Sequence, residues 1–335
     1  MPPRRIRPNV TWFVTRRTTR RHFLLRPDAD GTCQQLYWYT TAVLAAKFGI
    51  VLHAVQVLST HIHEVLTDTR GNLPQFVCER NRLLANALKV HRRWPEEVFQ
   101  RGAASLVELV GAHATAKEIG YTLANCVEAG LVSDPSLWPG VTTSIDDIGE
   151  RSVTVQRPAI YFDPRNKNWP HEATIRLEMP PILETTHGNA ARDVLRGYVI
   201  RAIDAAREAA QQAGRIVGQL HDLLNVAFHR SSQSPEPRRK RNPHFATGGD
   251  PTLTQRAREE RHSFLSAYRA ALDRWKKGDS QPRFPEGTWR WKKLFVTSDG
   301  STSVDANHST VTVFAKFLGW STSVPLRSAM WYARS

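Results

Sequence analysis

Two short apolar segments, residues 51–58 and 61–67, follow each other with only two residues between them. Both are rich in β-branched residues and leucine and are too short for a typical helix, so we predict two β-strands. Because so few residues connect them, the strands are expected to pair as a hairpin. We interpret the rest of the chain as organised around this hairpin.

The elements predicted on either side of the hairpin follow the order strand, helix, strand, strand, helix, and then further strand and helix. This is the order of a ferredoxin-like split βαβ unit. We therefore predict an α+β fold with an antiparallel sheet, followed by a mainly helical C-terminal region. The expected elements are a strand at 10–15, helices at 34–48, 73–93 and 114–130, and an apolar segment at 102–112 that fits either a strand or a buried helix.

The net charge indicates a polyanionic partner. The 335 residues include 46 lysines and arginines against 31 acidic residues, a formal net charge of +15. Such a charge is typical of proteins that bind nucleic acid or an anionic membrane surface. Arginine, the better bidentate ligand for phosphate, outnumbers lysine, and no run of about 18 apolar residues could span a membrane. Nucleic acid is therefore the expected partner, without membrane insertion.

The remaining composition is that of an ordinary soluble protein, with 41% hydrophobic and 23% charged residues. The three cysteines, Cys33, Cys78 and Cys126, are scattered and odd in number. This pattern argues against a disulfide framework and against a cysteine zinc site. We therefore expect a reducing, cytoplasmic location.

Arginines are concentrated in two parts of the N-terminal half. The first 26 residues hold eight arginines and no acidic residue, and the polar face of the helix predicted at 73–93 carries further cations. We predict that both parts bind phosphates, although the first can also be a solvated basic tail. The arginines assigned to DNA binding are Arg16, Arg17, Arg20, Arg21, Arg80, Arg92 and Arg93.

The composition shifts after about residue 145. Short β-type segments at 153–155, 160–162 and 174–177 alternate with prolines, and helices are expected within 189–228 and 252–277. The predicted parts are an α+β domain at 1–145, a β-rich connector at 146–182, a helical region at 183–280 that contains a basic linker at 231–250, and an aromatic and basic segment with a tail at 281–335.

His61 and His63 lie in the second strand of the hairpin. Side chains alternate between the two faces of a strand, so both imidazoles point to one face and Ile62 points to the other. Two imidazoles about 6–7 Å apart along a strand can chelate one metal ion if a third ligand comes from elsewhere. A partly exposed histidine pair without a metal is the alternative.

The third predicted helix carries Tyr121 and Asn125 on one face, because residues four apart are neighbours on a helix. At this spacing a tyrosine hydroxyl and an amide oxygen can reach the same metal-bound phosphate. Alternatively, the tyrosine is a core residue and the asparagine is a coincidence. Thr115 and Glu118 have the spacing of a capping box at the start of this helix, and Gly130 is expected to end it.

Three segments, in this order and spacing, resemble the REP-associated tyrosine transposases, which belong to the single-tyrosine HUH endonucleases. The segments are residues 11–15 (TWFVT), 55–63 (VQVLSTHIH) and 121–132 (YTLANCVEAGLV), the last followed by Trp-Pro at 138–139. Together the resemblance covers residues 8–145.

The resemblance implies that His61, His63 and Asn125 bind a metal ion and that Tyr121 is the nucleophile. The implied activity is cleavage and joining of single-stranded or hairpin DNA through a covalent 5′-phosphotyrosine, by a monomer or a homodimer in a bacterial cytoplasm. An amide oxygen ligand and a phosphate substrate favour Mg²⁺ or Mn²⁺.

The chain departs from this family at Glu64, where an apolar residue is usual, and at Cys126, where proline is usual. Neither departure removes a catalytic group. They leave open a second interpretation, a catalytically silent or domesticated regulator that binds nucleic acid and keeps the fold. A structural protein whose histidines only pack is a third interpretation, which the net charge of +15 disfavours.

Overall fold

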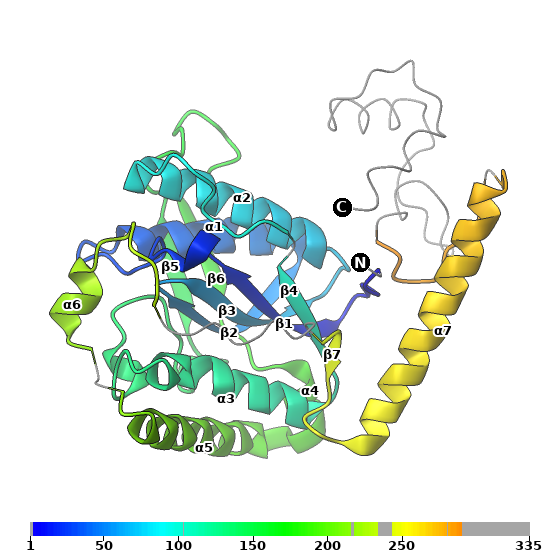
Figure 1. Ribbon diagram of the computed structural model, residues 1–335. Coiled ribbons are helices and arrows are strands. Elements are labelled where there is room, and N and C mark those ends of the chain that lie inside the picture. The colour runs from blue at the N-terminus through cyan, green and yellow to red at the C-terminus, as the bar shows by residue number, and fades with distance from the viewer. Residues whose placement is uncertain (1–2, 103, 216–217, 234–242, 280, 290–335) are drawn as a thin grey trace. The chain divides into compact units, whose positions relative to one another are not determined.

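The computed structural model describes most of the chain (Figure 1). Parts of the expected basic linker at 231–250 and most of the expected segment at 281–335 lie outside the described residues. The described residues are 3–102, 104–215, 218–233, 243–279 and 281–289.

The chain divides into two compact units. One comprises residues 7–257, and the other comprises residues 1–6 together with 258–335. The larger unit has no break at 145 or 182, where domain boundaries were expected, because side chains that follow residue 182 belong to the same hydrophobic core as the sheet.

A five-stranded sheet with the strand order β2-β3-β1-β4-β7 forms the centre of the larger unit. Strand β3 is antiparallel to β2 and to β1, β1 is antiparallel to β4, and β4 is parallel to β7. The first four strands have the order of a ferredoxin-like split βαβ, so the expected α+β fold with an antiparallel sheet is confirmed. The strands are β1 (Val10–Arg17), β2 (Ile50–Leu58), β3 (His61–Asp68), β4 (Ser105–Leu109) and β7 (Phe245–Ala246).

The sequence analysis left one of these strands, β4, undecided and did not predict another, β7. The apolar segment at 102–112, which fitted a strand or a helix, contains β4. Strand β7 lies within 231–250, so the expectation that this whole segment is a linker is wrong. Glu108 of β4 pairs with Phe245, and the backbone N–H of Val110 donates to Ala246 at 2.8 Å.

Helices cover both faces of the sheet. Figure 1 shows α1 and α2 on one face and α3, α4 and α5 on the other. A separate two-stranded sheet pairs β5 with β6, whereas residues 160–162, expected to be a further β-type segment, form no strand and lie in and just after a turn at 159–161. The helices are α1 (Thr32–Phe48), α2 (Leu73–Arg92), α3 (Ala112–Glu128), α4 (Pro181–His187), α5 (Ala191–Gln212), α6 (Leu220–Asn225) and α7 (Pro251–Lys276), and the remaining strands are β5 (Ser152–Gln156) and β6 (Glu172–Arg176). Among the described helices, none has the length and apolar character that a membrane span requires.

The N-terminal cap of α3 differs from the predicted one, whereas the C-terminal end of the helix agrees with the prediction. Gly111 is the N-cap residue and no side chain caps the helix, so the capping box predicted from Thr115 and Glu118 is wrong. The Thr115 hydroxyl instead donates to the Gly111 carbonyl at 3.0 Å, because Thr115 lies inside the first turn. At the other end Gly130 has φ +69°, and its N–H donates to Val127 at 2.8 Å, which closes the helix as expected.

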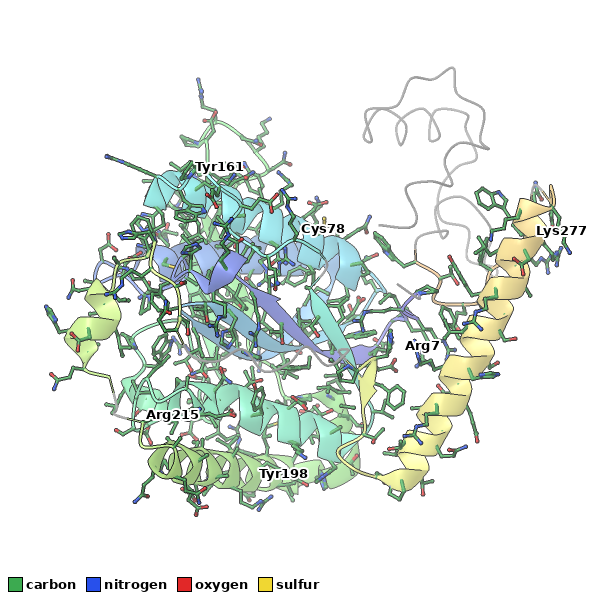
Figure 2. The ribbon with its side chains drawn as sticks, in the orientation of Figure 1. Arg7, Cys78, Tyr161, Tyr198, Arg215 and Lys277 are labelled. Atoms are coloured by element: carbon green, nitrogen blue, oxygen red, sulfur yellow. The ribbon has the colours of Figure 1, made fainter. Side chains whose placement is uncertain are left out.

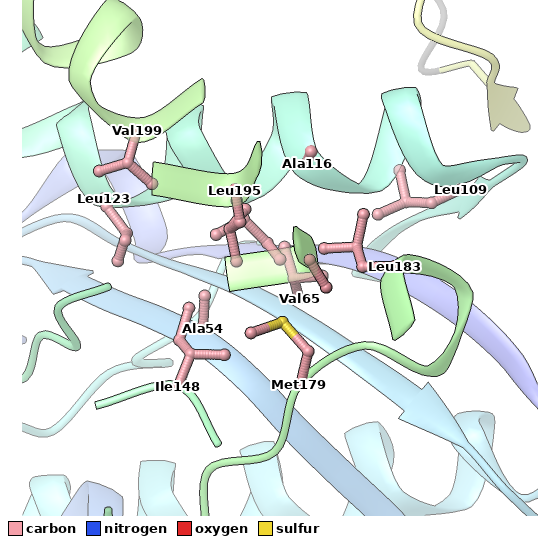
Figure 3. Close-up of a cluster of buried hydrophobic side chains, with 12 residues drawn as sticks. Ala54, Val65, Leu109, Ala116, Leu123, Ile148, Met179, Leu183, Leu195 and Val199 are labelled. Atoms are coloured by element: carbon pink, nitrogen blue, oxygen red, sulfur yellow. The ribbon is translucent and has the colours of Figure 1, made fainter. Parts of the chain in front are cut away.

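A hydrophobic core holds α3 between the sheet and α5. Figure 3 shows Ala54 and Val65 of the sheet in the same cluster as Leu123 of α3 and Leu195 of α5. Gly120 lets the two helices approach closely, because a Cβ atom at this position would lie 2.9 Å from the Tyr198 carbonyl oxygen. The position of α3 over the sheet is therefore fixed by packing on both of its sides.

The opposite face of β3 buries an ion pair. Arg80 of α2 donates to both carboxylate oxygens of Glu64, with Nη1 at 2.5 Å and Nη2 at 2.7 Å. Burial lowers the pKa of Arg80, but the Glu64 carboxylate outweighs this effect and raises the pKa above its ordinary value. Arg92 is likewise buried and lies 2.5 Å from Asp28. The expectation that Arg80 and Arg92 lie on an exposed, DNA-binding face is therefore wrong.

Candidate active site

The two histidines of β3 lie on the face that α3 covers. Strand alternation places Ile62 and Glu64 on the other face, as expected. The rings of His61 and His63 are perpendicular to each other, with centroids 4.6 Å apart. Pairing with β1 places Thr15 opposite His63 and Arg17 opposite His61.

Asn125 meets the histidines from α3. Its Oδ1 atom lies 3.2 Å from Nε2 of His61. On the other side of the ring, Nδ1 of His61 lies 2.8 Å from the Thr60 hydroxyl, which holds the orientation of the imidazole. His61 therefore adjoins both His63 and the Asn125 amide oxygen, and the metal site that the sequence analysis predicted stays a prediction.

His63 is buried with an unsatisfied nitrogen. Its ring stacks on Phe13, with centroids 5.3 Å apart, and its Nδ1 lies 3.4 Å from the Thr15 hydroxyl. Its Nε2 is buried and has no hydrogen-bond partner in the described part of the chain. An unsatisfied buried polar atom costs about 1–3 kcal/mol, so this nitrogen marks a position where a ligand would be stabilising.

Burial keeps both imidazoles neutral. Together with a smaller contribution from the charge of Arg17, it lowers the pKa of His61 to about 4. It lowers the pKa of His63 well below its ordinary value, with smaller contributions from His61 and Arg17. The neutral imidazole is the form that binds a metal ion.

Tyr121 lies beside this cluster at the surface. It is 37% exposed, and its ring is 5.5 Å from that of His63 and 6.0 Å from that of Phe13. Burial of the hydroxyl, together with smaller contributions from Glu128 and Glu118, raises its pKa to about 12. The charge of Arg17 and a hydrogen bond with Asn125 act in the opposite direction. The phenol is therefore protonated at neutral pH.

The residues of this cluster can hold a metal ion. Among the described residues no group of three or more histidine, cysteine, aspartate and glutamate side chains could hold a metal ion, so a site here depends on the Asn125 amide as third ligand. The separation of 3.2 Å between His61 and Asn125 is compatible with this, because two adjacent ligands about 2.1 Å from an octahedral ion lie about 3 Å apart. Together with the unsatisfied His63 nitrogen, the donor set fits a divalent cation.

Sequence reasoning missed three polar residues that hold the cluster in place. Thr15 and Thr60 contact the histidines, and Gln56 accepts a hydrogen bond from the Cys126 backbone N–H at 3.0 Å. Gln56 is opposite His63 in the β2–β3 register and is fully buried, so it ties α3 to the sheet next to Asn125. A polar residue inside the mostly apolar strand β2 was the signal for it.

The arginines predicted to bind DNA differ in their surroundings. Arg17, Arg20 and Arg93 are exposed. Arg16 is partly buried, where it donates to the Gly102 carbonyl at 2.7 Å, and Arg21 donates to the Ser232 carbonyl at 2.8 Å. Of this group, Arg17 is the residue next to the histidines.

Comparison with known proteins gives a distant likeness among solved structures. No protein-family model matches the chain, and no curated protein matches it. Among solved structures, the chain is similar to a REP-associated tyrosine transposase bound to a REP hairpin, with 20% sequence identity, 42% of this chain and 81% of that chain covered, and a TM-score of 0.36. A likeness this low supports no inference about activity.

Proposed function

We propose that the protein is a metal-dependent endonuclease and strand transferase for single-stranded DNA, which acts through a covalent 5′-phosphotyrosine on Tyr121. The observation that carries the proposal is the convergence of His61, His63 and Asn125 beside a surface tyrosine. The sequence resemblance to the REP-associated tyrosine transposases supports the same reaction.

The chain's own residues would act as follows. Nε2 of His61, Nε2 of His63 and Oδ1 of Asn125 would hold Mg²⁺ or Mn²⁺, which when bound supplies Lewis-acid polarisation of the phosphate. The Tyr121 oxygen attacks phosphorus, the bond from phosphorus to the 3′-oxygen breaks, and the phenol proton ends on the released 3′-hydroxyl. Attack of a 3′-hydroxyl on the phosphotyrosine reverses these steps and joins two strands without an external energy source.

Arg17 supplies positive charge next to the two histidines and Tyr121. It is exposed, lies opposite His61 in the sheet, and has no side-chain partner in the described part of the chain. Its charge also acts on His61, His63 and Tyr121, which shows that it is close to all three. We assign it to hold a non-bridging oxygen of the scissile phosphate.

One observation favours a second candidate function. Burial, with smaller contributions from Glu128 and Glu118, raises the pKa of Tyr121 to about 12, so the phenol is not activated by its surroundings. A regulator that binds nucleic acid without cleaving it needs no such activation.

An adduct assay tests the proposal. The full chain is incubated with hairpin DNA that carries labelled single-stranded flanks of randomised sequence, with Mn²⁺ or Mg²⁺, and separated on a denaturing gel. We expect a metal-dependent covalent adduct that is lost in Tyr121→Phe and kept in Tyr198→Phe, a tyrosine of α5 that hydrogen-bonds His113. An adduct that persists in Tyr121→Phe refutes the nucleophile assignment, and binding without any adduct supports the regulator.

A further inference from the structure

Thr18 connects two parts of the backbone that flank the candidate active site. It follows Arg17 at the end of β1 and is buried. Its backbone N–H donates to the Thr60 carbonyl at 2.8 Å, and its hydroxyl lies 3.1 Å from the same oxygen. This oxygen belongs to the peptide unit that joins Thr60 to His61. Thr18 therefore links the backbone next to Arg17 with the backbone next to His61.

The peptide unit between Thr60 and His61 sets the position from which the imidazole of His61 extends. Because a peptide unit is planar, a contact that holds the Thr60 oxygen also holds the backbone nitrogen of His61. The Thr60 hydroxyl holds the imidazole itself, since it lies 2.8 Å from Nδ1, while Nε2 faces Asn125. The backbone contact from Thr18 and the side-chain contact from Thr60 thus act on the same histidine.

The turn that follows Thr18 is strained. Arg20 and Arg21 are consecutive non-glycine residues, yet both have positive φ, +45° and +56°. This left-handed conformation brings Cβ close to the following carbonyl oxygen, and it persists only where surrounding contacts impose it. The Thr18 hydroxyl is such a contact, because it donates to the His22 carbonyl at 2.7 Å and closes the turn.

The segment that follows α6 holds the same turn. The backbone N–H of Ser232 donates to the Arg21 carbonyl at 3.2 Å, and the Arg21 side chain donates to the Ser232 carbonyl at 2.8 Å. Thr18 differs from this pair because its hydroxyl contacts both the turn and the Thr60 carbonyl. Loss of that hydroxyl would therefore let the strained turn relax at the point where it meets the candidate active site.

We propose that Thr18 is a positioning residue whose buried hydroxyl holds the strained turn at 19–22 and thereby places His61 for metal binding and Arg17 for phosphate binding. Thr18 itself touches neither the metal ion nor DNA. The inference rests on the proposed function, because it concerns the same site. It adds a reason why a buried threonine and two left-handed arginines occur next to that site.

The affinity of the full chain for Mn²⁺, measured by titration calorimetry without DNA, tests this proposal. Thr18→Val keeps the branched shape and removes the hydroxyl. Loss of a contact that orients a metal ligand typically costs about 10- to 100-fold in affinity, so Thr18→Val should bind Mn²⁺ at least about tenfold more weakly. Thr18→Ser keeps the hydroxyl and should stay within about threefold of the wild type.

Relief of the strain should restore the affinity. Glycine adopts positive φ without a steric penalty, so the double variant Thr18→Val, Arg20→Gly should bind Mn²⁺ within about threefold of the wild type. Arg20→Ala is the matched control, because it removes the same charge and keeps the strain. Tyr161, which Figure 2 shows beside α2, also has positive φ, and Tyr161→Gly relieves strain away from the site. Neither control should restore the affinity of Thr18→Val.

Hydrogen exchange on the wild type needs no variant and therefore decides even if Thr18→Val does not fold. Coupling is reciprocal, so Mn²⁺ should slow exchange of the Thr18 amide about tenfold more than that of Thr143, whose N–H donates to Val55 at 3.1 Å. Equal slowing of both amides, normal Mn²⁺ affinity in Thr18→Val, or equal rescue by Arg20→Gly and Arg20→Ala overturns the inference. A wild type that binds no Mn²⁺ instead refutes the proposed metal site, and the inference with it.

Discussion

Glu64 and Arg80 form a bidentate ion pair in which neither side chain is exposed to solvent. Removing one partner of such a pair leaves an uncompensated buried charge, at a cost of about 3–5 kcal/mol. We therefore expect Arg80→Ala to lower the free energy of unfolding by this amount, measured by urea denaturation. The double variant Glu64→Leu, Arg80→Met should lose much less. Equal losses in the single and double variants would show that packing, and not charge, sets the cost.

His63→Phe separates metal binding from stability. The substitution keeps a ring against Phe13 and removes the unsatisfied Nε2, so the metal-free free energy of unfolding should stay constant or rise by about 1 kcal/mol. Stabilisation by Mn²⁺, followed as a shift in melting temperature, should disappear.

The matched control for this prediction is His53→Phe. Both nitrogens of His53 have partners, the Glu178 carbonyl and the Thr67 hydroxyl, each at 2.7 Å. Its replacement should therefore cost about 1–3 kcal/mol while the response to Mn²⁺ persists. A normal Mn²⁺ shift in His63→Phe would place the metal elsewhere.

Arg17→Gln should slow cleavage more than it weakens binding. A charge-assisted hydrogen bond contributes about 1.5–3 kcal/mol, so loss of the contact with the scissile phosphate should reduce the single-turnover rate about 10- to 100-fold. The measurement is the rate of adduct formation at saturating DNA, and Arg17→Lys should recover part of it. If Arg17→Gln changes only the affinity for DNA, the residue belongs to the general binding surface.

Gly120→Ala is expected to destabilise the protein although alanine favours helices. The gain in helix propensity is about 1 kcal/mol, whereas the new Cβ would lie 2.9 Å from the Tyr198 carbonyl oxygen and 3.2 Å from Cβ of Ala202. Overpacking of this kind costs about 1–3 kcal/mol, so the balance should be a net loss in urea denaturation. A net gain in stability would mean that α3 and α5 can separate without cost.

Stability should fall in acid because of Asp28. Burial raises the pKa of this carboxyl, but hydrogen bonds with His91 and Arg92 outweigh burial and lower it to about 2. Since the unfolded-state pKa is about 3.9, the folded state favours the carboxylate, and its contribution of about 2 kcal/mol is present above pH 4 and is lost as the pH falls towards 2. Asp28→Asn should remove this part of the pH dependence in urea denaturation, whereas Asp273→Asn, an exposed residue of α7, should leave it unchanged.

Local periodicity was enough to predict the strand hairpin, the shared face of His61 and His63, and the shared face of Tyr121 and Asn125. Each depends only on the geometry of one element. The burial of Arg80 could also have been predicted from its spacing to apolar residues, although the sequence analysis placed Arg80 on the exposed face of the helix. Arg80 is four residues from Phe76 and from Leu84, both buried, so it occupies the apolar stripe of α2.

The contacts that complete the site depend on pairing between elements and could not be predicted from one element alone. Thr15 contacts His63 because of the register between β1 and β3, and Gln56 reaches Cys126 because α3 crosses β2 at that point. Strand β7 is a two-residue segment, too short to show any periodicity. Such features follow from tertiary packing.

The parallel pairing of β4 with β7 has a consequence for folding during synthesis. Glu108 leaves the ribosome long before its partner Phe245, and at about 5–20 residues per second the interval is on the order of ten seconds. The ferredoxin-like strands and α3 can assemble in that time, while the outer edge of β4 still lacks its neighbour. An open edge is where another chain can add a strand, so the nascent protein would be most prone to misassembly before residue 246 emerges.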